Sequence, residues 1–83
     1  MIDELRAQIS ATDRELVALV NRRIGLVAEL KRYKDEHRIA FVDPEREAAL
    51  FDERAAENEG PLSDEGLRAF YAELLALTKR ELG

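Results

Sequence analysis

The first 37 residues contain no proline and return a mostly apolar side chain at every third or fourth position, the spacing of one face of an α-helix. A helix over residues 2–37 would be roughly 50 Å long, which exceeds the width of a compact domain of this size. One chain cannot cover such a face. The pattern therefore predicts a long helix that packs against its copy in a second chain. The face comprises Ile2, Leu5, Ile9, Thr12, Leu16, Leu19, Arg23, Leu26, Leu30 and Tyr33.

A second helix is expected over residues 43–58. The preceding residues 38–42 carry no helical pattern and are expected to form an extended connector. Asp43-Pro44 is a strong helix start, because Asp is a favoured N-cap and the missing N–H of proline is not needed at the first helical position. The expected inward face of this helix is Arg46, Glu47, Leu50, Phe51 and Arg54.

A third helix is expected over residues 63–82, after the break at Gly60 and Pro61 and with Ser63 as its N-cap. Residues 1–83 are therefore expected to form a single domain of an all-α fold. Because the first helix overhangs the other two, we expect an intertwined homodimer with three helices in each chain. The face of the third helix is Leu67, Phe70, Tyr71, Leu74, Leu75, Thr78 and Leu82.

Composition excludes several classes of function. The chain of 83 residues has no cysteine, which excludes disulfides and thiolate metal sites. A net charge of −5 argues against a general nucleic-acid binder. No stretch approaches the roughly 18 apolar residues of a membrane span, and the N-terminus does not resemble a signal peptide. We therefore expect a cytoplasmic protein that binds neither nucleic acid nor membrane.

Basic residues nevertheless concentrate in the middle of this acidic chain, which indicates a site for a small anion. Arg23 occupies a face position that the periodicity reserves for an apolar residue, and Lys34 follows eleven residues later on nearly the same side. Their Cα atoms would lie about 16 Å apart, with Val27 and Leu30 between them. Two cations separated by an apolar floor suit a partly apolar dianion. The basic residues are Arg22, Arg23, Lys31, Arg32, Lys34, Arg38 and Arg46.

Further side chains are candidates for the same site. Arg46 in the first turn of a helix opposes the macrodipole, and a bound anion would stabilise it there. Asp43 and Glu47 could accept a hydrogen bond from a hydroxyl group of the ligand, and Thr78 could donate one. Arg6 is too far from Arg23 to reach the same ligand within one chain, but it could do so from an antiparallel partner helix.

Each candidate also has an ordinary structural explanation. An arginine on a helix face is more often paired with a carboxylate across an interface, Lys34 could cap helix carbonyls, and Arg46 could pair with a neighbouring glutamate. His37 is expected to be a solvated helix end. The sequence offers no nucleophile, metal-ligand cluster or phosphate-binding loop. If the chain is an enzyme, its catalysis must rest on positioning and electrostatics.

The chain resembles the small all-helical chorismate mutases over almost its whole length, through LRAQISATDRELVALVNRRIGLVAELKRYK, VDPEREAAL and NEGPLSDEGLRAFYAELLALTK. The resemblance implies an intertwined dimer with two active sites, each built from both chains. It also implies an isomerase of phenylalanine and tyrosine biosynthesis that converts chorismate to prephenate by a [3,3] rearrangement, without a cofactor.

The resemblance also implies roles for individual residues. Arg6 of the partner chain and Arg23 would hold the carboxylates of chorismate. Lys34 would donate a hydrogen bond to the ether oxygen, where negative charge grows in the transition state. The remaining substrate contacts would come from Asp43, Arg46, Glu47 and Thr78.

Two positions depart from the family pattern. Some members have an arginine where this chain has Val42, and many have a glutamine where it has Leu82. Without that glutamine, either the activity is reduced, or a protonated Glu81 replaces it and activity would rise at low pH, or an extension beyond Gly83 contributes. Because the family also occurs fused to DAHP synthase, the alternative function is a non-catalytic dimerisation or ligand-sensing domain that regulates such a synthase. A lyase acting on isochorismate is a third hypothesis.

Overall fold

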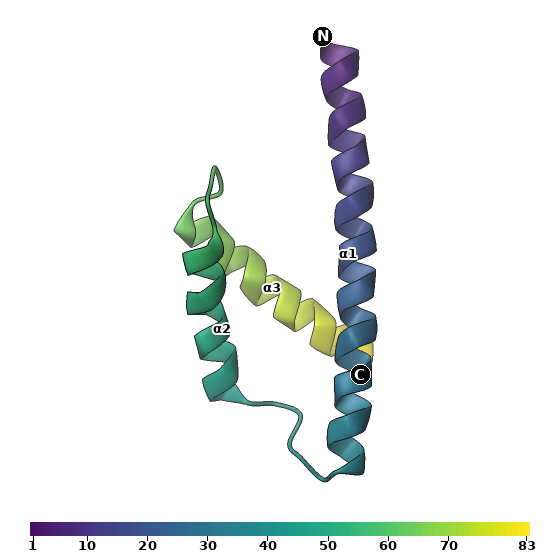
Figure 1. Cartoon of the computed structure of the whole chain (residues 1–83), viewed down its shortest axis with the longest axis vertical. Coiled ribbons are helices and arrows are strands. Elements are labelled where there is room, and N and C mark those ends of the chain that lie inside the picture. The colour runs from purple at the N-terminus through teal and green to yellow at the C-terminus, as the bar shows by residue number, and fades with distance from the viewer.

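A computed structural model describes the whole chain, residues 1–83, as three α-helices without a strand (Figure 1). Helix α1 spans Ile2–Glu36, α2 spans Pro44–Glu57 and α3 spans Asp64–Leu82. The predicted all-α fold with one very long helix is confirmed, and the observed helix ends lie within one residue of the predicted ones. None of the three helices has a stretch apolar enough to cross a lipid bilayer.

The starts of α2 and α3 are fixed by local side-chain caps. Asp43 Oδ1 accepts a hydrogen bond from the backbone N–H of Arg46 at 3.1 Å, and Ser63 Oγ accepts one from Gly66 at 3.0 Å. Each cap satisfies a donor that the first helical turn leaves unpaired. Both predicted N-caps are confirmed.

The end of α1 turns the chain back towards the other helices. Arg38 adopts a positive φ of 56°, and the backbone N–H of Ile39 bonds the carbonyl of Lys34 at 2.8 Å. This is the Schellman arrangement, in which a left-handed residue reverses the chain and satisfies the last carbonyls of a helix. His37 is the exposed C-cap residue, as predicted, and its Nδ1 lies 2.8 Å from the carbonyl oxygen of Tyr33. The reversal carries residues 39–43 across to the start of α2 (Figure 1).

Helix α3 holds the chain together because it packs against both α1 and α2, which do not pack directly on each other. In Figure 1 it crosses diagonally from the far end of α2 to the C-terminal half of α1. The two buried residues of the chain, Tyr71 and Thr78, both belong to α3. The rings of Phe51 and Tyr71 meet edge to face with centroids 5.3 Å apart, which joins α2 to α3.

The predicted inward face of α2 is correct except for Arg46. Glu47, Leu50, Phe51 and Arg54 are half-buried. Arg46 is exposed, and its guanidinium lies 3.4 Å from the carboxylate of Glu53 on the outer surface. Arg46 therefore lies at the edge of this face, where its side chain pairs with Glu53 instead of entering the interior.

The N-terminal half of α1 extends beyond the other helices (Figure 1). The chain measures 55 × 23 × 18 Å with a radius of gyration of 15.7 Å, whereas a compact chain of this length would have about 12 Å. Its surface of 6706 Å² exceeds the roughly 5,000 Å² of a folded monomer of equal mass. A Cβ at Gly25 would meet nothing within 4 Å, so Gly25 is not closely packed within the chain. Large exposed apolar residues of α1 are Ile2, Leu5, Ile9, Leu16, Val17, Leu19, Leu26 and Leu30.

Candidate active site

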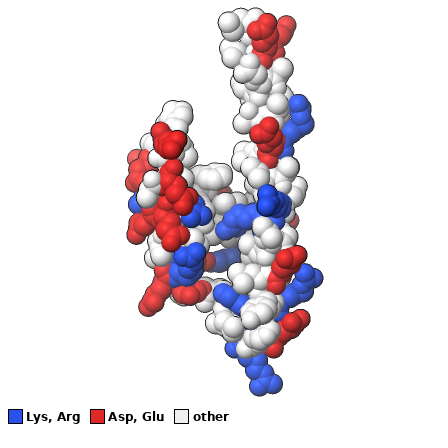
Figure 2. All heavy atoms as spheres, in the orientation of Figure 1, with Lys and Arg blue, Asp and Glu red and all other residues white.

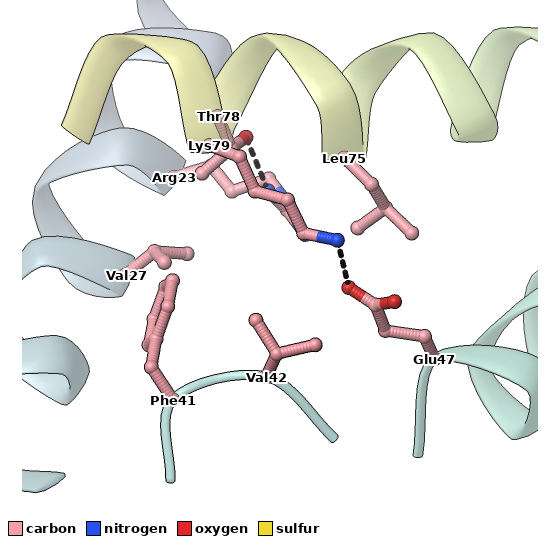
Figure 3. Close-up of a pocket in the computed structure, with 8 residues that line it drawn as sticks. All are labelled: Arg23, Val27, Phe41, Val42, Glu47, Leu75, Thr78 and Lys79. Carbon is pink, nitrogen blue, oxygen red and sulfur yellow. Dashed lines mark hydrogen bonds and ion pairs between the residues drawn. The ribbon is translucent and has the colours of Figure 1, made fainter. Parts of the chain in front are cut away.

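One pocket is built jointly by all three helices and the connector between α1 and α2 (Figure 3). Its cavity volume is about 70 Å³, which is below the roughly 300–1,000 Å³ typical of sites for drug-sized molecules. Four of its eight lining residues are hydrophobic, and the rest are charged or hydroxylic. The lining residues are Arg23 and Val27 of α1, Phe41 and Val42 of the connector, Glu47 of α2, and Leu75, Thr78 and Lys79 of α3.

Arg23 is half-buried at the pocket and is oriented by α3. Its Nη1 donates a hydrogen bond to Thr78 Oγ1 at 2.9 Å, and its Cζ lies 5.9 Å from the centre of the Tyr71 ring. Thr78 in turn donates to the carbonyl of Leu74 at 2.8 Å, so its hydroxyl is available as an acceptor for Arg23. No carboxylate of the chain forms an ion pair with Arg23. The guanidinium is therefore fixed in direction and retains N–H donors for an anion.

Glu47 and Lys79 face each other across the pocket from α2 and α3 (Figure 3). Lys79 Nζ lies 2.7 Å from Glu47 Oε1, with side chains 44% and 30% exposed. Lys79 is not among the residues predicted from the sequence, because a lysine near the end of a helix is explained by the macrodipole alone. The one feature of the sequence that could have indicated Lys79 as a site residue is its position directly after Thr78, which was predicted.

Lys34 lies beside the pocket rather than among its lining residues. Its Nζ is 3.5 Å from the carbonyl oxygen of Phe41, the upper limit for a hydrogen bond, so this contact is weak. Lys31 makes firmer contacts one turn earlier: its Nζ donates to the carbonyl of Leu82 at 3.2 Å and lies 5.6 Å from the centre of the Phe41 ring. Lys31 thus joins α1 to the connector and to the last turn of α3.

Of the predicted site residues, Arg23, Glu47 and Thr78 meet in the pocket. Arg46 does not enter it, because it points outward to Glu53. The remaining predicted residues also lie outside the lining of this pocket. Asp43 serves as the N-cap of α2, Glu81 is exposed without a hydrogen bond, and Arg6 is exposed on the N-terminal half of α1. Of the two apolar residues predicted to lie between Arg23 and Lys34, Val27 lines the pocket and Leu30 does not.

Of the predicted cationic residues only Arg23 lines the pocket, and Lys79 supplies its second cation. Figure 2 shows Lys and Arg atoms gathered in the opening between α1 and α2, while Asp and Glu cover much of α2. The positive groups therefore face the space where the pocket lies. No group of three or more His, Cys, Asp or Glu side chains is placed to hold a metal ion.

Comparison with known proteins identifies relatives of this chain. The family model described as chorismate mutase type II matches residues 5–81. The fold matches form I of the chorismate mutase from Thermus thermophilus with a TM-score of 0.89 and 32% identity, covering 93% of this chain and 96% of that one. Form II of the same enzyme matches with a TM-score of 0.90, also at 32% identity, covering 95% and 90%.

A curated relative, the T-protein of Haemophilus influenzae, is 34% identical over 80 residues. The match covers 90% of this chain but only 21% of the T-protein. The chain therefore spans about a fifth of that relative's length.

Proposed function

The chain belongs to the chorismate mutase type II family, a family of isomerases, and on this premise we propose that it converts chorismate to prephenate. The observation that carries the proposal is the state of Arg23. A half-buried guanidinium lines a partly apolar pocket, is held by Thr78, and has no carboxylate partner in the chain. Such a group is suited to a carboxylate of a small dianion.

The reaction itself makes few chemical demands on the protein. In the [3,3] rearrangement the ether C–O bond breaks as a C–C bond forms, and no proton or leaving group is transferred. The protein must hold the substrate in a folded conformation and stabilise negative charge that grows on the ether oxygen. In our proposal Arg23 holds one carboxylate, and Lys34 leaves the weak contact with Phe41 to donate to the ether oxygen.

The other predicted contacts are assigned by the same reasoning. Glu47 lies in the pocket and can accept a hydrogen bond from the substrate hydroxyl. Asp43 uses Oδ1 for the N-cap of α2, so its other oxygen would serve the ligand. Arg46 would have to leave Glu53 before it could take part. For Glu81 the prediction is unchanged: its protonated side chain would replace the glutamine that many family members have at the position of Leu82.

A homodimer with shared sites is the second part of the proposal. Its support is the excess surface of the chain, the exposed apolar face of α1, and the length of α1 beyond its contacts with α3. Two antiparallel copies of α1 would cover each other's apolar face. The same arrangement would bring Arg6 of the partner subunit towards the pocket that contains Arg23.

The alternative, a non-catalytic regulatory domain, is not favoured by the comparisons, because the solved structures that match are chorismate mutases. Association or fusion with a DAHP synthase stays a prediction, as does a cytoplasmic location.

The purified chain is expected to consume chorismate with formation of an equal amount of prephenate, and to sediment as a dimer at micromolar concentration. Chorismate is followed by its ultraviolet absorbance and prephenate by chromatography. Addition of EDTA is expected to leave the rate unchanged, because the proposed chemistry uses no metal. Absence of turnover from about pH 4 to pH 8 would refute the activity, and a monomer would refute the shared site.

A further inference from the structure

Lys79 has a function that neither the family resemblance nor the helical periodicity assigns. Resting on the function proposed above, we propose that Lys79 is a positioning residue: it neutralises Glu47 and fixes its carboxylate so that the pocket can admit a dianionic substrate. The contact that carries this inference is the 2.7 Å ion pair between Lys79 Nζ and Glu47 Oε1, which joins α3 to α2 at the pocket wall (Figure 3).

The charge of the pocket explains why Glu47 requires a partner. Among the lining residues, Arg23 and Lys79 are cationic and Glu47 is anionic, so the lining carries one net positive charge. Without Lys79 this charge falls to zero, and an unpaired carboxylate would face the incoming dianion. Like charges in a partly desolvated site repel each other strongly, whereas a paired carboxylate can still accept a hydrogen bond.

The geometry also explains why Lys79 acts through Glu47. A contact of 2.7 Å is that of a charge-assisted hydrogen bond, and it directs the ammonium group of Lys79 towards Glu47. In Figure 3 the ion pair lies on one side of the pocket, and Phe41 and Val27 lie on the other. The side chain of Glu47 is held by no other hydrogen bond or ion pair. Its direction therefore depends on Lys79.

The expected effect of losing Lys79 is on binding rather than on the chemical step. The total charge of the substrate does not change during the rearrangement, so the repulsion from an unpaired Glu47 is nearly equal in the ground and transition states. Lys79→Met is expected to raise KM about tenfold while kcat changes less than about threefold. Lys79→Arg, which keeps the charge, is expected to restore KM.

Two further variants distinguish this role from a structural one. Glu47→Gln removes the carboxylate that Lys79 neutralises, so adding Lys79→Met to Glu47→Gln should change KM far less than Lys79→Met does in the wild type. The control is Arg80→Met, which removes the same charge one residue later from an ion pair with Glu73 outside the pocket. This control should leave KM unchanged.

The experiment measures kcat and KM for all variants and, in parallel, the affinity of each variant for the dianionic product prephenate by calorimetry. A raised KM for Lys79→Met, rescued by arginine and absent in the Glu47→Gln background, is the expected result. An unchanged KM, or an equal rise in both backgrounds, would overturn the inference. Failure of the proposed function would appear separately, as a wild-type chain without turnover, while the binding ratios would still decide the role of Lys79.

Discussion

Replacement of Arg23 by alanine is expected to lower kcat/KM for chorismate about 100- to 1,000-fold. Arg23 has no carboxylate partner in the chain, so its positive charge is available to the substrate. Its hydrogen bond to Thr78 and its position by the Tyr71 ring fix the guanidinium before the substrate arrives. The loss should be measured from initial rates of chorismate consumption over a range of concentrations.

The matched control for this substitution is Arg22→Ala. Arg22 is exposed, lies next to Arg23 and forms no ion pair in the chain, so the control removes the same charge from the same helix. Thermal unfolding should be measured for both variants. Arg23→Ala is expected to lower the stability little, because the Thr78 hydroxyl keeps its hydrogen bond to the carbonyl of Leu74. Equal activity losses in the two variants, or a loss below about threefold at Arg23, would contradict a specific role for its guanidinium.

Replacement of Lys34 by methionine is expected to lower kcat about 100- to 1,000-fold with a smaller change in KM. A donor to the ether oxygen stabilises charge that is present mainly in the transition state, and its removal therefore slows the chemical step. Because the 3.5 Å contact with Phe41 is weak, this substitution should alter the fold little.

Arg32→Met serves as the control for Lys34, because Arg32 is an exposed cation two residues earlier on the same helix. It should retain nearly the full kcat. If Lys34→Met instead raises KM and leaves kcat unchanged, Lys34 contributes only to uniform binding of the substrate, and its assignment to the ether oxygen is wrong.

Local features of the fold could be predicted from the sequence because their causes are local. The N-caps at Asp43 and Ser63 and the break at Gly60 and Pro61 depend on residues within a few positions, and the observed helix ends follow them. Arg23 could be predicted as a site residue for a similar reason. It interrupts an apolar face, and the face of a straight helix follows from spacing alone.

Contacts between helices could not be predicted in the same way. Spacing does not determine how far α2 is rotated about its own axis, since this depends on its packing against α3 through Phe51 and Tyr71. The observed rotation turns Glu47 inward and its neighbour Arg46 outward. The ion pair of Lys79 with Glu47 could not be predicted for the same reason, because it depends on how α3 packs against α2.

The two departures from the family pattern have different structural settings. Val42 lines the pocket, at a position where some members of the family are expected to have an arginine. The carbonyl of Leu82 accepts a hydrogen bond from Lys31, which ties the last turn of α3 to α1. The C-terminal turn is thus attached to the helix that carries Arg23 and Lys34, although Leu82 itself offers no side-chain donor to a ligand.

The central claim is that two copies of this chain together form a site that rearranges chorismate, and mixing two inactive variants tests it most directly. Arg6→Ala and Arg23→Ala are each expected to be nearly inactive as homodimers. In a mixed dimer, one site would combine the intact Arg23 of one chain with the intact Arg6 of the other, and the second site would lack both.

The two variants should be mixed in equal amounts, left to exchange subunits and assayed for chorismate consumption. Random exchange places half of the chains in mixed dimers with one intact site each, so about a quarter of wild-type activity is expected. A mixture no more active than its two components, with exchange verified by mass spectrometry, would contradict the shared site.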